Sequence, residues 1–222
     1  MSSSVIEELA FLKFGRTKEH LQSFVEKGEI YINSYEFFKK SDANSKQFDI
    51  HEFANEFVQP QGVKIHIAGR EFNPASPFSI SHTPTPFTHI FCLFNVQDPS
   101  TASTSKVYDQ RVWEDFGEYV VLIHNVKEFR RRIYKELAGF KGLNAERNLV
   151  SYFDRERYHG ELTPFHKQST YSYQNEYRIA INYRELKGQP LVLNLGSMTD
   201  IAYGPVHKSQ CENKIQQGRI AI

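Results

Sequence analysis

The apolar run over residues 88–96 constrains the fold more than any other part of this chain. At its centre five successive residues are apolar, in the order Ile90-Phe91-Cys92-Leu93-Phe94. Such a run is typical of a strand that is buried on both faces, so it requires other strands beside it and packed elements above and below. We therefore expect this strand at the centre of a sheet.

The remaining pattern predicts short strands and few helices around that centre. Leu21, Phe24 and Val25 form the apolar stripe of a helix that begins after Thr17 and ends at Gly28. Apolar spacing over residues 126–137 predicts a second helix, with the arginines at 130–132 on its solvated face. Further strands are predicted at residues 11–14, 29–33, 118–124, 148–153, 177–183, 191–195 and 218–222. The pattern indicates an α+β fold.

The chain of 222 residues is long enough to bury one core, and no internal repeat divides it. Six of its nine prolines lie between residues 60 and 99, where clusters of Pro and Ser/Thr predict loop structure. We expect a single domain over residues 1–222, with a Pro-rich loop insertion at about residues 60–87 that lies over a site.

The bulk composition disfavours several classes of partner and site. The 27 Lys and Arg residues balance 26 Asp and Glu residues, so no overall field selects a nucleic acid or a membrane. Cys92 and Cys211 offer neither a disulfide framework nor a metal-ligand spacing, and the nine histidines show no i, i+4 pair. No segment reads as an export signal or approaches the roughly 20 apolar residues of a membrane span. We expect a cytoplasmic protein without a metal ion.

Glu176 stands at the start of an alternating aromatic and aliphatic run within residues 171–181. In a strand, Tyr177, Ile179 and Ile181 share one face, so Glu176 points to the other face together with Arg178. An acid at such a place is more often a surface ion pair than a catalytic residue. Gln174, two residues earlier, is expected on the same face of the strand as Glu176.

The form Gln174-Asn175-Glu176 is similar to the Gln-x-Glu motif of ADP-ribosyltransferases, and Asn175-Glu176-Tyr177 resembles the catalytic strand of poly-ADP-ribose polymerases. The opening unit, Leu12-Lys13-Phe14 and then Glu26-Lys27-Gly28-Glu29-Ile30-Tyr31 after a helix, resembles the first unit of many ADP-ribosyltransferases. The layout of most of the chain also resembles a sparsely characterised bacterial family that is often found in phage-defence loci.

This resemblance implies a split β-sandwich, in which two small sheets with flanking helices form a cleft, and an enzyme that uses NAD as a substrate. It implies that Glu176 is catalytic, because a carboxylate can bind the ribose 2′-OH and offset the charge of an oxocarbenium-like transition state. Gln174 would orient the acceptor. The resemblance also implies NAD contacts, by cations to the diphosphate and by stacking tyrosines, from Lys13, Arg16, Tyr31, Tyr35 and Arg178. Lys13 stands where these families usually carry His or Arg.

We therefore expect an NAD-dependent ADP-ribosyltransferase that acts as a toxin or effector in bacterial defence against phage. Its acceptor would be RNA, DNA or a protein, and an antitoxin or inhibitor protein would restrain it. Two alternatives stay open. A non-catalytic protein of the same fold would bind a nucleotide or a protein partner as a sensor, and an RNA-cleaving toxin would use His159, His166 and Lys167 as acid, base and phosphate anchor.

Overall fold

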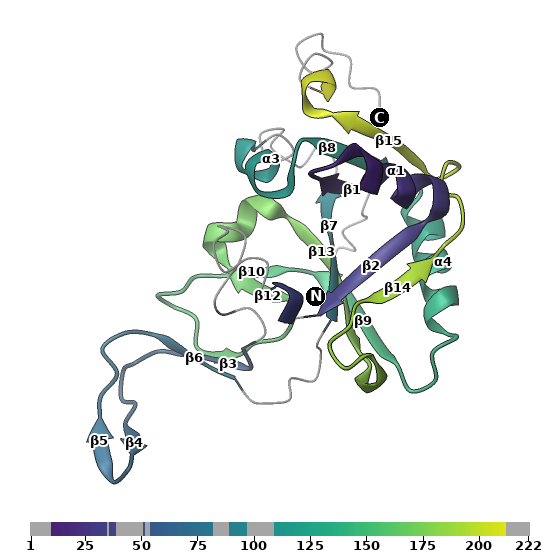
Figure 1. The fold of residues 1–222 in the computed structure, drawn as a ribbon. Coiled ribbons are helices and arrows are strands. Elements are labelled where there is room, and N and C mark those ends of the chain that lie inside the picture. Colours follow the sequence, from purple (N-terminus) through teal and green to yellow (C-terminus); the bar gives the residue numbers. More distant parts are fainter. Residues whose placement is uncertain are drawn as a thin grey trace, which may run out of the picture.

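The computed structural model describes residues 10–34, 36–38, 51, 54–81, 89–96 and 109–211. Over these residues the protein has a mixed α+β fold around an eight-stranded antiparallel sheet (Figure 1), which confirms the α+β part of the prediction. The strands of this sheet are β1 (Ala10–Gly15), β2 (Glu29–Ser34), β7 (His89–Val96), β8 (Tyr119–Ile123), β9 (Asn144–Leu149), β13 (Glu176–Asn182), β14 (Leu191–Asn194) and β15 (Ala202–His207).

Strand β7 is the hub of this sheet, as its apolar run predicts. Along one edge it pairs with β13 over residues 89–94. Along the other edge it pairs with β2 at its first two residues and with β1 at its last three, Phe94 to Val96. The sheet therefore forks along this edge: β14 continues beyond β2, while β8 and β15 continue beyond β1. The backbone from Phe91 to Leu93 lies between the two branches.

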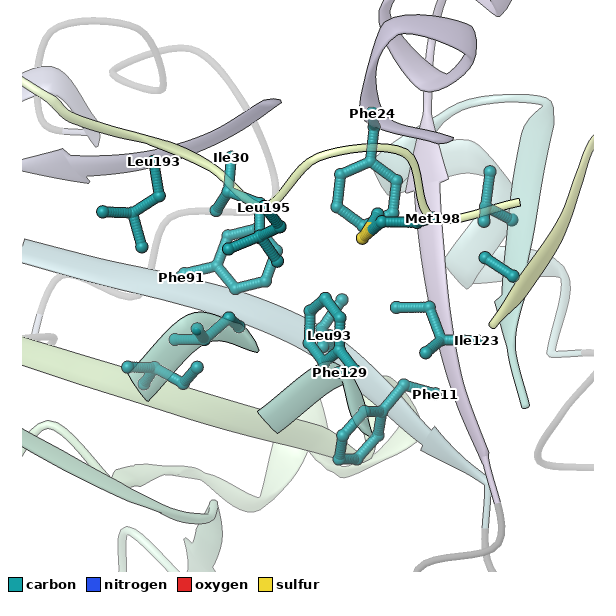
Figure 2. Packing of buried hydrophobic residues seen from close by; sticks show 14 of the residues in the cluster. Phe11, Phe24, Ile30, Phe91, Leu93, Ile123, Phe129, Leu193, Leu195 and Met198 are labelled. Carbon is teal, nitrogen blue, oxygen red and sulfur yellow. The ribbon is translucent and has the colours of Figure 1, made fainter. Parts of the chain in front are cut away.

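The main core joins the sheet to two helices, α1 (Lys18–Lys27) and α4 (Val126–Leu137). Figure 2 shows Phe24 of α1 and Phe129 of α4 among sheet residues such as Phe11, Phe91 and Leu93. Each fully buried side chain of this size stabilises the fold by about 1.5–3 kcal/mol relative to an exposed one. The apolar stripes predicted for both helices are confirmed as their buried faces.

Strand β13 divides its side chains between this core and the opposite face. Tyr177, Ile179 and Ile181 lie in the main core, where Tyr177 stacks on Phe11 with ring centroids 4.4 Å apart. Ala180 lies in a separate small cluster, and the charged residues alternate with the core residues along the strand. The face assignment predicted from the sequence is therefore confirmed.

Helix α1 ends at a glycine that no other residue can replace without strain. Gly28 has φ 67°, in the left-handed region, and its N–H donates to the carbonyl of Phe24 at 3.1 Å. A Cβ at this position would lie 2.2 Å from the carbonyl oxygen of Gly196. Gly28 is thus required both by its conformation and by the close approach of the segment that follows β14.

Part of the predicted loop at about residues 60–87 forms short strands, within its described residues 60–81. Strands β4 (Ile65–Ile67) and β5 (Arg70–Phe72) form a hairpin through Ala68 and Gly69, which have φ 49° and 74° and suit a two-residue turn. The hairpin projects from the body of the protein in Figure 1. A separate three-stranded sheet has β3 (Glu56–Val58) at its centre, flanked by β6 (Phe78–Ile80) and β11 (Gly160–Glu161). Residues 82–87 lie outside the described part.

The described strands differ from the prediction at two other places. The single strand predicted at 148–153 is divided, because pairing with β13 ends at Leu149 and β10 (Ser151–Phe153) pairs in parallel with β12 (His166–Gln168). The strand predicted at 218–222 lies outside the described residues. Strand β15 was not predicted, because Gly204 and Pro205 interrupt its pattern, and Pro is tolerated at a sheet edge.

The remaining described helices are short: α3 (Gln110–Phe116) and the 3-10 helices η1 (Ser169–Gln174) and η2 (Arg184–Leu186). In this part of the chain no helix combines the length and the apolar composition that crossing a membrane requires.

Candidate functional site

A cavity of about 200 Å³ lies at the fork of the sheet. Its walls come from β1, β2, β7 and β13, with contributions from α3, β12 and η1. The polar side chains that line it are Lys13, Asn33, Lys167, Gln174, Glu176 and Arg178, and aromatic rings line it from Phe14, Tyr31, Phe38, Phe91, Phe94 and Phe116. The cavity thus gathers residues that lie more than 160 positions apart in the sequence.

Glu176 is buried in the wall of this cavity, with 5% of its side chain exposed. Its Oε1 accepts a hydrogen bond from Lys167 Nζ at 2.8 Å, and its Oε2 accepts one from Arg178 Nε at 2.7 Å. Burial raises the pKa of Glu176, but the charges and hydrogen bonds of Arg178 and Lys167 outweigh it and hold that pKa well below its usual range. Glu176 is therefore an ionised carboxylate at any pH near neutrality.

Lys167 is held by both polar residues of the Gln-x-Glu motif. Its ammonium donates to Gln174 Oε1 at 2.7 Å as well as to Glu176 Oε1, and it lies 4.8 Å from the ring centroid of Tyr171. We refer to Gln174, Lys167 and Glu176 as the lysine clamp. The sequence interpretation assigned Lys167 only to an RNA-cleaving alternative and did not place it beside Glu176.

Gln174 reaches the cavity by a different route from the predicted one. It is the last residue of η1 and not part of β13, and Asn175 between it and Glu176 has φ 39°, in the left-handed region. The prediction that strand alternation places both side chains on one face is therefore wrong, although both line the cavity. The turn at Asn175 brings the amide of Gln174 beside the carboxylate instead.

A buried acid that the sequence interpretation missed completes this arrangement. Asp115 of α3 accepts hydrogen bonds from the hydroxyl of Tyr173 and from Gln174 Nε2, the latter at 3.3 Å. Burial and the hydrogen bond to Asp115 raise the pKa of Tyr173 above its usual value. No sequence pattern singled out Asp115, because a contact between residues 59 positions apart has no local signal.

Lys13 enters the cavity from β1 and meets β7 in the gap between its two partners. Its Nζ donates to the carbonyl of Cys92 at 3.2 Å and lies 4.6 Å from the ring centroid of Phe91. Burial lowers the pKa of Lys13, while Cys92 and Glu176 oppose that shift. The ammonium has three donors, so it retains capacity for a ligand beside the one carbonyl.

Two of the other four predicted NAD contacts, Arg178 and Tyr31, line the cavity. Arg178 lines the cavity but is almost fully buried, with its guanidinium directed to Glu176 and to the carbonyl of Pro164 at 2.7 Å. Tyr31 lines the cavity and is 53% exposed. Arg16 is exposed and is not among the residues that line the cavity. Tyr35 lies outside the described residues.

The cavity lining carries excess positive charge. Lys13, Lys167 and Arg178 face a single lining carboxylate, that of Glu176, so the protonated site has an excess of two positive charges. A buried excess of this kind is costly unless it is compensated. The site therefore favours a ligand that carries negative charge.

Two residues of the RNA-cleaving alternative point away from each other. His166 and Lys167 are neighbours in β12, so their side chains leave opposite faces of the strand. The Nδ1 atoms of His159 and His166 accept hydrogen bonds from the backbone N–H groups of Gln59 and Thr163. Among the described residues, no group of three or more His, Cys, Asp or Glu side chains is placed to hold a metal ion.

No family model, curated protein or solved structure matches this chain. The geometry and charge of the cavity and the Gln-x-Glu motif are therefore the observations that indicate a function.

Proposed function

We propose that this protein is an NAD-dependent ADP-ribosyltransferase whose active site is the cavity at the fork of β7. The observation that carries the proposal is that Lys13 and Tyr31 of the opening unit line one cavity with Glu176, which the motif resemblance selects from a distant part of the chain. The fork, with β2 and β14 on one branch and β1, β8 and β15 on the other, supports a split β-sandwich with a cleft between two small sheets.

The proposed reaction breaks the bond between C1′ of the ribose and the nicotinamide nitrogen. The bonding electron pair leaves with nicotinamide, the acceptor nucleophile forms a bond to C1′, and the acceptor loses a proton. Glu176 stays ionised, so it can accept a hydrogen bond from the ribose 2′-OH and offset the positive charge that develops on the ribose. Two cations already bind this carboxylate, which has about four lone-pair sites and so retains acceptor capacity.

The charge of the lining suits the diphosphate of NAD. Lys13 is the ammonium with remaining donors, and a diphosphate near it would compensate the excess positive charge of the cavity. The cavity of about 200 Å³ is smaller than the roughly 300–1,000 Å³ of typical ligand pockets. We therefore assign only one end of NAD to it, with Tyr31 at the mouth as a stacking surface for a ring.

One observation favours a second candidate, a non-catalytic sensor that binds an anionic nucleotide. Both oxygens of Glu176 are bonded to cations, and the local sum of Glu176, Lys167 and Arg178 is positive, which opposes a developing oxocarbenium ion. The same charge distribution binds an anionic ligand well without any reaction. The two candidates therefore differ in turnover and not in the place where the ligand binds.

The biological role is part of the proposal. We assign the protein to a toxin or effector role in defence against phage, within the cytoplasm, restrained by an antitoxin or inhibitor protein. This assignment is supported only by the family resemblance. The acceptor is an RNA, a DNA or a protein, and the first experiment is designed to distinguish these classes.

The test is to incubate the protein with NAD labelled in its ADP-ribose part and with a lysate, then to measure label in separated protein, RNA and DNA. Wild type and Glu146→Gln should transfer label, and Glu176→Gln should not. Glu146 is a matched control, because it is an exposed glutamate on β9, the strand next to β13. Transfer by folded Glu176→Gln would overturn the proposal. Calorimetric binding of NAD without transfer by wild type would establish the sensor.

A second variant is needed because Glu176→Gln leaves two buried cations without their carboxylate. The double change Glu176→Gln with Lys167→Met removes one charge of each sign and is the better-folded reference. Circular dichroism and thermal unfolding decide which of the two variants is folded, and the loss of transfer is judged on the folded one.

A further inference from the structure

We infer that Asp115 is a positioning residue, which fixes the amide of Gln174 and thereby sets the place of the Lys167 ammonium beside Glu176. This goes one step beyond the proposed function and rests on it, since the position of Lys167 affects turnover only if Glu176 acts on a substrate. The geometric link itself is independent of any reaction and can be measured separately.

Asp115 is a buried carboxylate that accepts hydrogen bonds from two side chains. Asp115 is 8% exposed and lies on α3, outside the residues that line the cavity. Its Oδ2 accepts from the hydroxyl of Tyr173 and from the amide of Gln174. The exposed guanidinium of Arg111 lies 4.0 Å from the ring centroid of Tyr173, and Asp115 itself reaches inward to Gln174. A buried carboxylate oxygen is stabilised by an N–H donor, whereas the carbonyl oxygen of an amide at the same place would repel it.

Asp115 and Lys167 together fix the orientation of the Gln174 side-chain amide. With Nε2 directed to Asp115, Oε1 is necessarily directed to Lys167, to which it is bonded at 2.7 Å. The reverse orientation would place the amide oxygen against a carboxylate and the NH₂ group against an ammonium. Two unfavourable contacts would replace two favourable ones, so the charge on Asp115 selects one orientation.

The orientation of the Gln174 amide affects how Lys167 binds Glu176. Its ammonium is shared between Gln174 Oε1 and Glu176 Oε1, at 2.7 and 2.8 Å. If Gln174 turned away, the ammonium would lose one oxygen acceptor and would bind Glu176 more closely, which neutralises that carboxylate more fully. Asp115 thus acts through Gln174 on the charge that Glu176 can present to a ribose. A loss of this kind lowers kcat more than it changes KM, because it affects charge that develops in the transition state.

The test uses Asp115→Asn and a double variant, Asp115→Asn with Gln174→Glu, which exchanges the carboxylate and the amide between the two positions. In the double variant the new carboxylate presents an oxygen to Lys167 in either orientation, and the new amide donates to it. Asp109→Asn is the matched control, because Asp109 lies at the start of the same helix, pairs with the exposed Arg111, and belongs to neither the clamp nor the cavity.

The first readout is the NMR resonance of the Lys167 ammonium, with lysine labelled by ¹⁵N and the assignment made by comparison with Lys167→Arg. We expect Asp115→Asn to shift this resonance from its wild-type position, the double variant to differ from Gln174→Glu alone, and Asp109→Asn to leave the resonance unchanged. An unchanged resonance in folded Asp115→Asn would overturn the inference. If Asp115→Asn does not fold, the double variant is compared with Gln174→Glu alone, since both place the same carboxylate beside Lys167: different resonances support the link, and equal resonances refute it.

The second readout is transfer from NAD. We expect Asp115→Asn to lower kcat about tenfold with KM changed by less than about twofold, and Asp109→Asn to leave both constants unchanged. A wild type without transfer contradicts the proposed function, while the resonance experiment still tests Asp115. A wild type with transfer and an Asp115→Asn variant with unchanged kcat contradicts the role of Asp115 alone.

Discussion

The ammonium of Lys13 binds the carbonyl of Cys92, 3.2 Å away. Cys92 lies in the stretch of β7 between its pairing with β2 and its pairing with β1. On the opposite edge of β7, the residue paired with Cys92 is Arg178. Two of the three cations that line the cavity are thus placed by one residue of the central strand, from its two sides. The position of the cavity follows from the fork of the sheet.

Lys13 should control the affinity for anionic ligands. We expect Lys13→Met to weaken the binding of ADP-ribose about tenfold, because one close charge pair is worth on the order of 1.4 kcal/mol at such a site. Lys13→Arg should retain binding, and Lys27→Met should be unchanged, since Lys27 is exposed at the far end of α1. Isothermal titration calorimetry measures these affinities. Equal affinities of wild type and Lys13→Met would contradict the assignment.

The same residue should make binding depend on pH. Burial lowers the pKa of Lys13, so the ammonium loses its proton at a lower pH than an exposed lysine would. Affinity for ADP-ribose should therefore fall as the pH rises through this lowered pKa. In Lys13→Arg the fall should be absent, because arginine stays protonated. Calorimetry over a series of alkaline pH values checks this, and a parallel fall in both proteins would assign it to another group.

Glu176 should contribute strongly to stability near neutral pH and less in acid. Its pKa is held below the value of 4.5 that it has when unfolded, so its contribution is complete above that value and is lost as the pH falls through the native pKa. Removal of the carboxylate from two buried cations should cost about 3–5 kcal/mol in Glu176→Gln. Urea unfolding at about pH 7 should show this loss, and at about pH 3 the difference from wild type should be smaller. A difference that is constant over pH would indicate that Glu176 is not ionised in the folded protein.

The hairpin of β4 and β5 should be dispensable for the cavity. None of its residues lines the cavity, and its side chains include the exposed Ile67 and Phe72, 61% and 49% exposed. Replacement of residues 64–73 by an Asn-Gly turn should leave the affinity for ADP-ribose within about twofold and the stability within about 1 kcal/mol. A large loss of affinity would return this segment to its predicted place over the site.

Gly28 should be far more sensitive to substitution than a glycine of similar backbone conformation elsewhere. Gly28→Ala places a Cβ 2.2 Å from the carbonyl of Gly196, whereas Gly62, with φ 75°, has no atom within 4 Å of such a Cβ. Gly62→Ala should cost about 1–2 kcal/mol from strain alone, and Gly28→Ala should cost clearly more. Chemical unfolding of both variants measures the difference. Equal costs would show that the segment around Gly196 can move away.

The sequence predicted what depends on local pattern. The alternation in β13 and the apolar run in β7 assigned the core faces correctly, because burial on one face or on two leaves a direct trace in residue type. The hairpin of β4 and β5 was missed because Pro and Ser/Thr residues nearby suggested a loop, although Pro60, Pro74 and Pro77 lie outside its strands. The left-handed turn at Asn175 was not visible in the pattern either.

The site was predictable only in part, for a related reason. Glu176 and Lys13 were selected by motif resemblance, and both line the cavity. Asp115 and the partnership of Lys167 with Gln174 were missed, because they depend on how α3 and β12 pack beside η1. Contacts between side chains that are far apart in sequence follow from the assembled fold and leave no local signal.

The alternation of β13 ties the cavity to folding. Its odd-numbered residues from Tyr177 to Ile181 fill the core. The even-numbered Glu176 and Arg178 supply charge to the cavity. A one-residue slip, or a single inserted residue before Glu176, would exchange the two sets and bring both charges into the apolar core. Molecules with a misplaced carboxylate would therefore fail to fold instead of persisting as inactive protein, so the assembly of this strand also acts as a check on the integrity of the site.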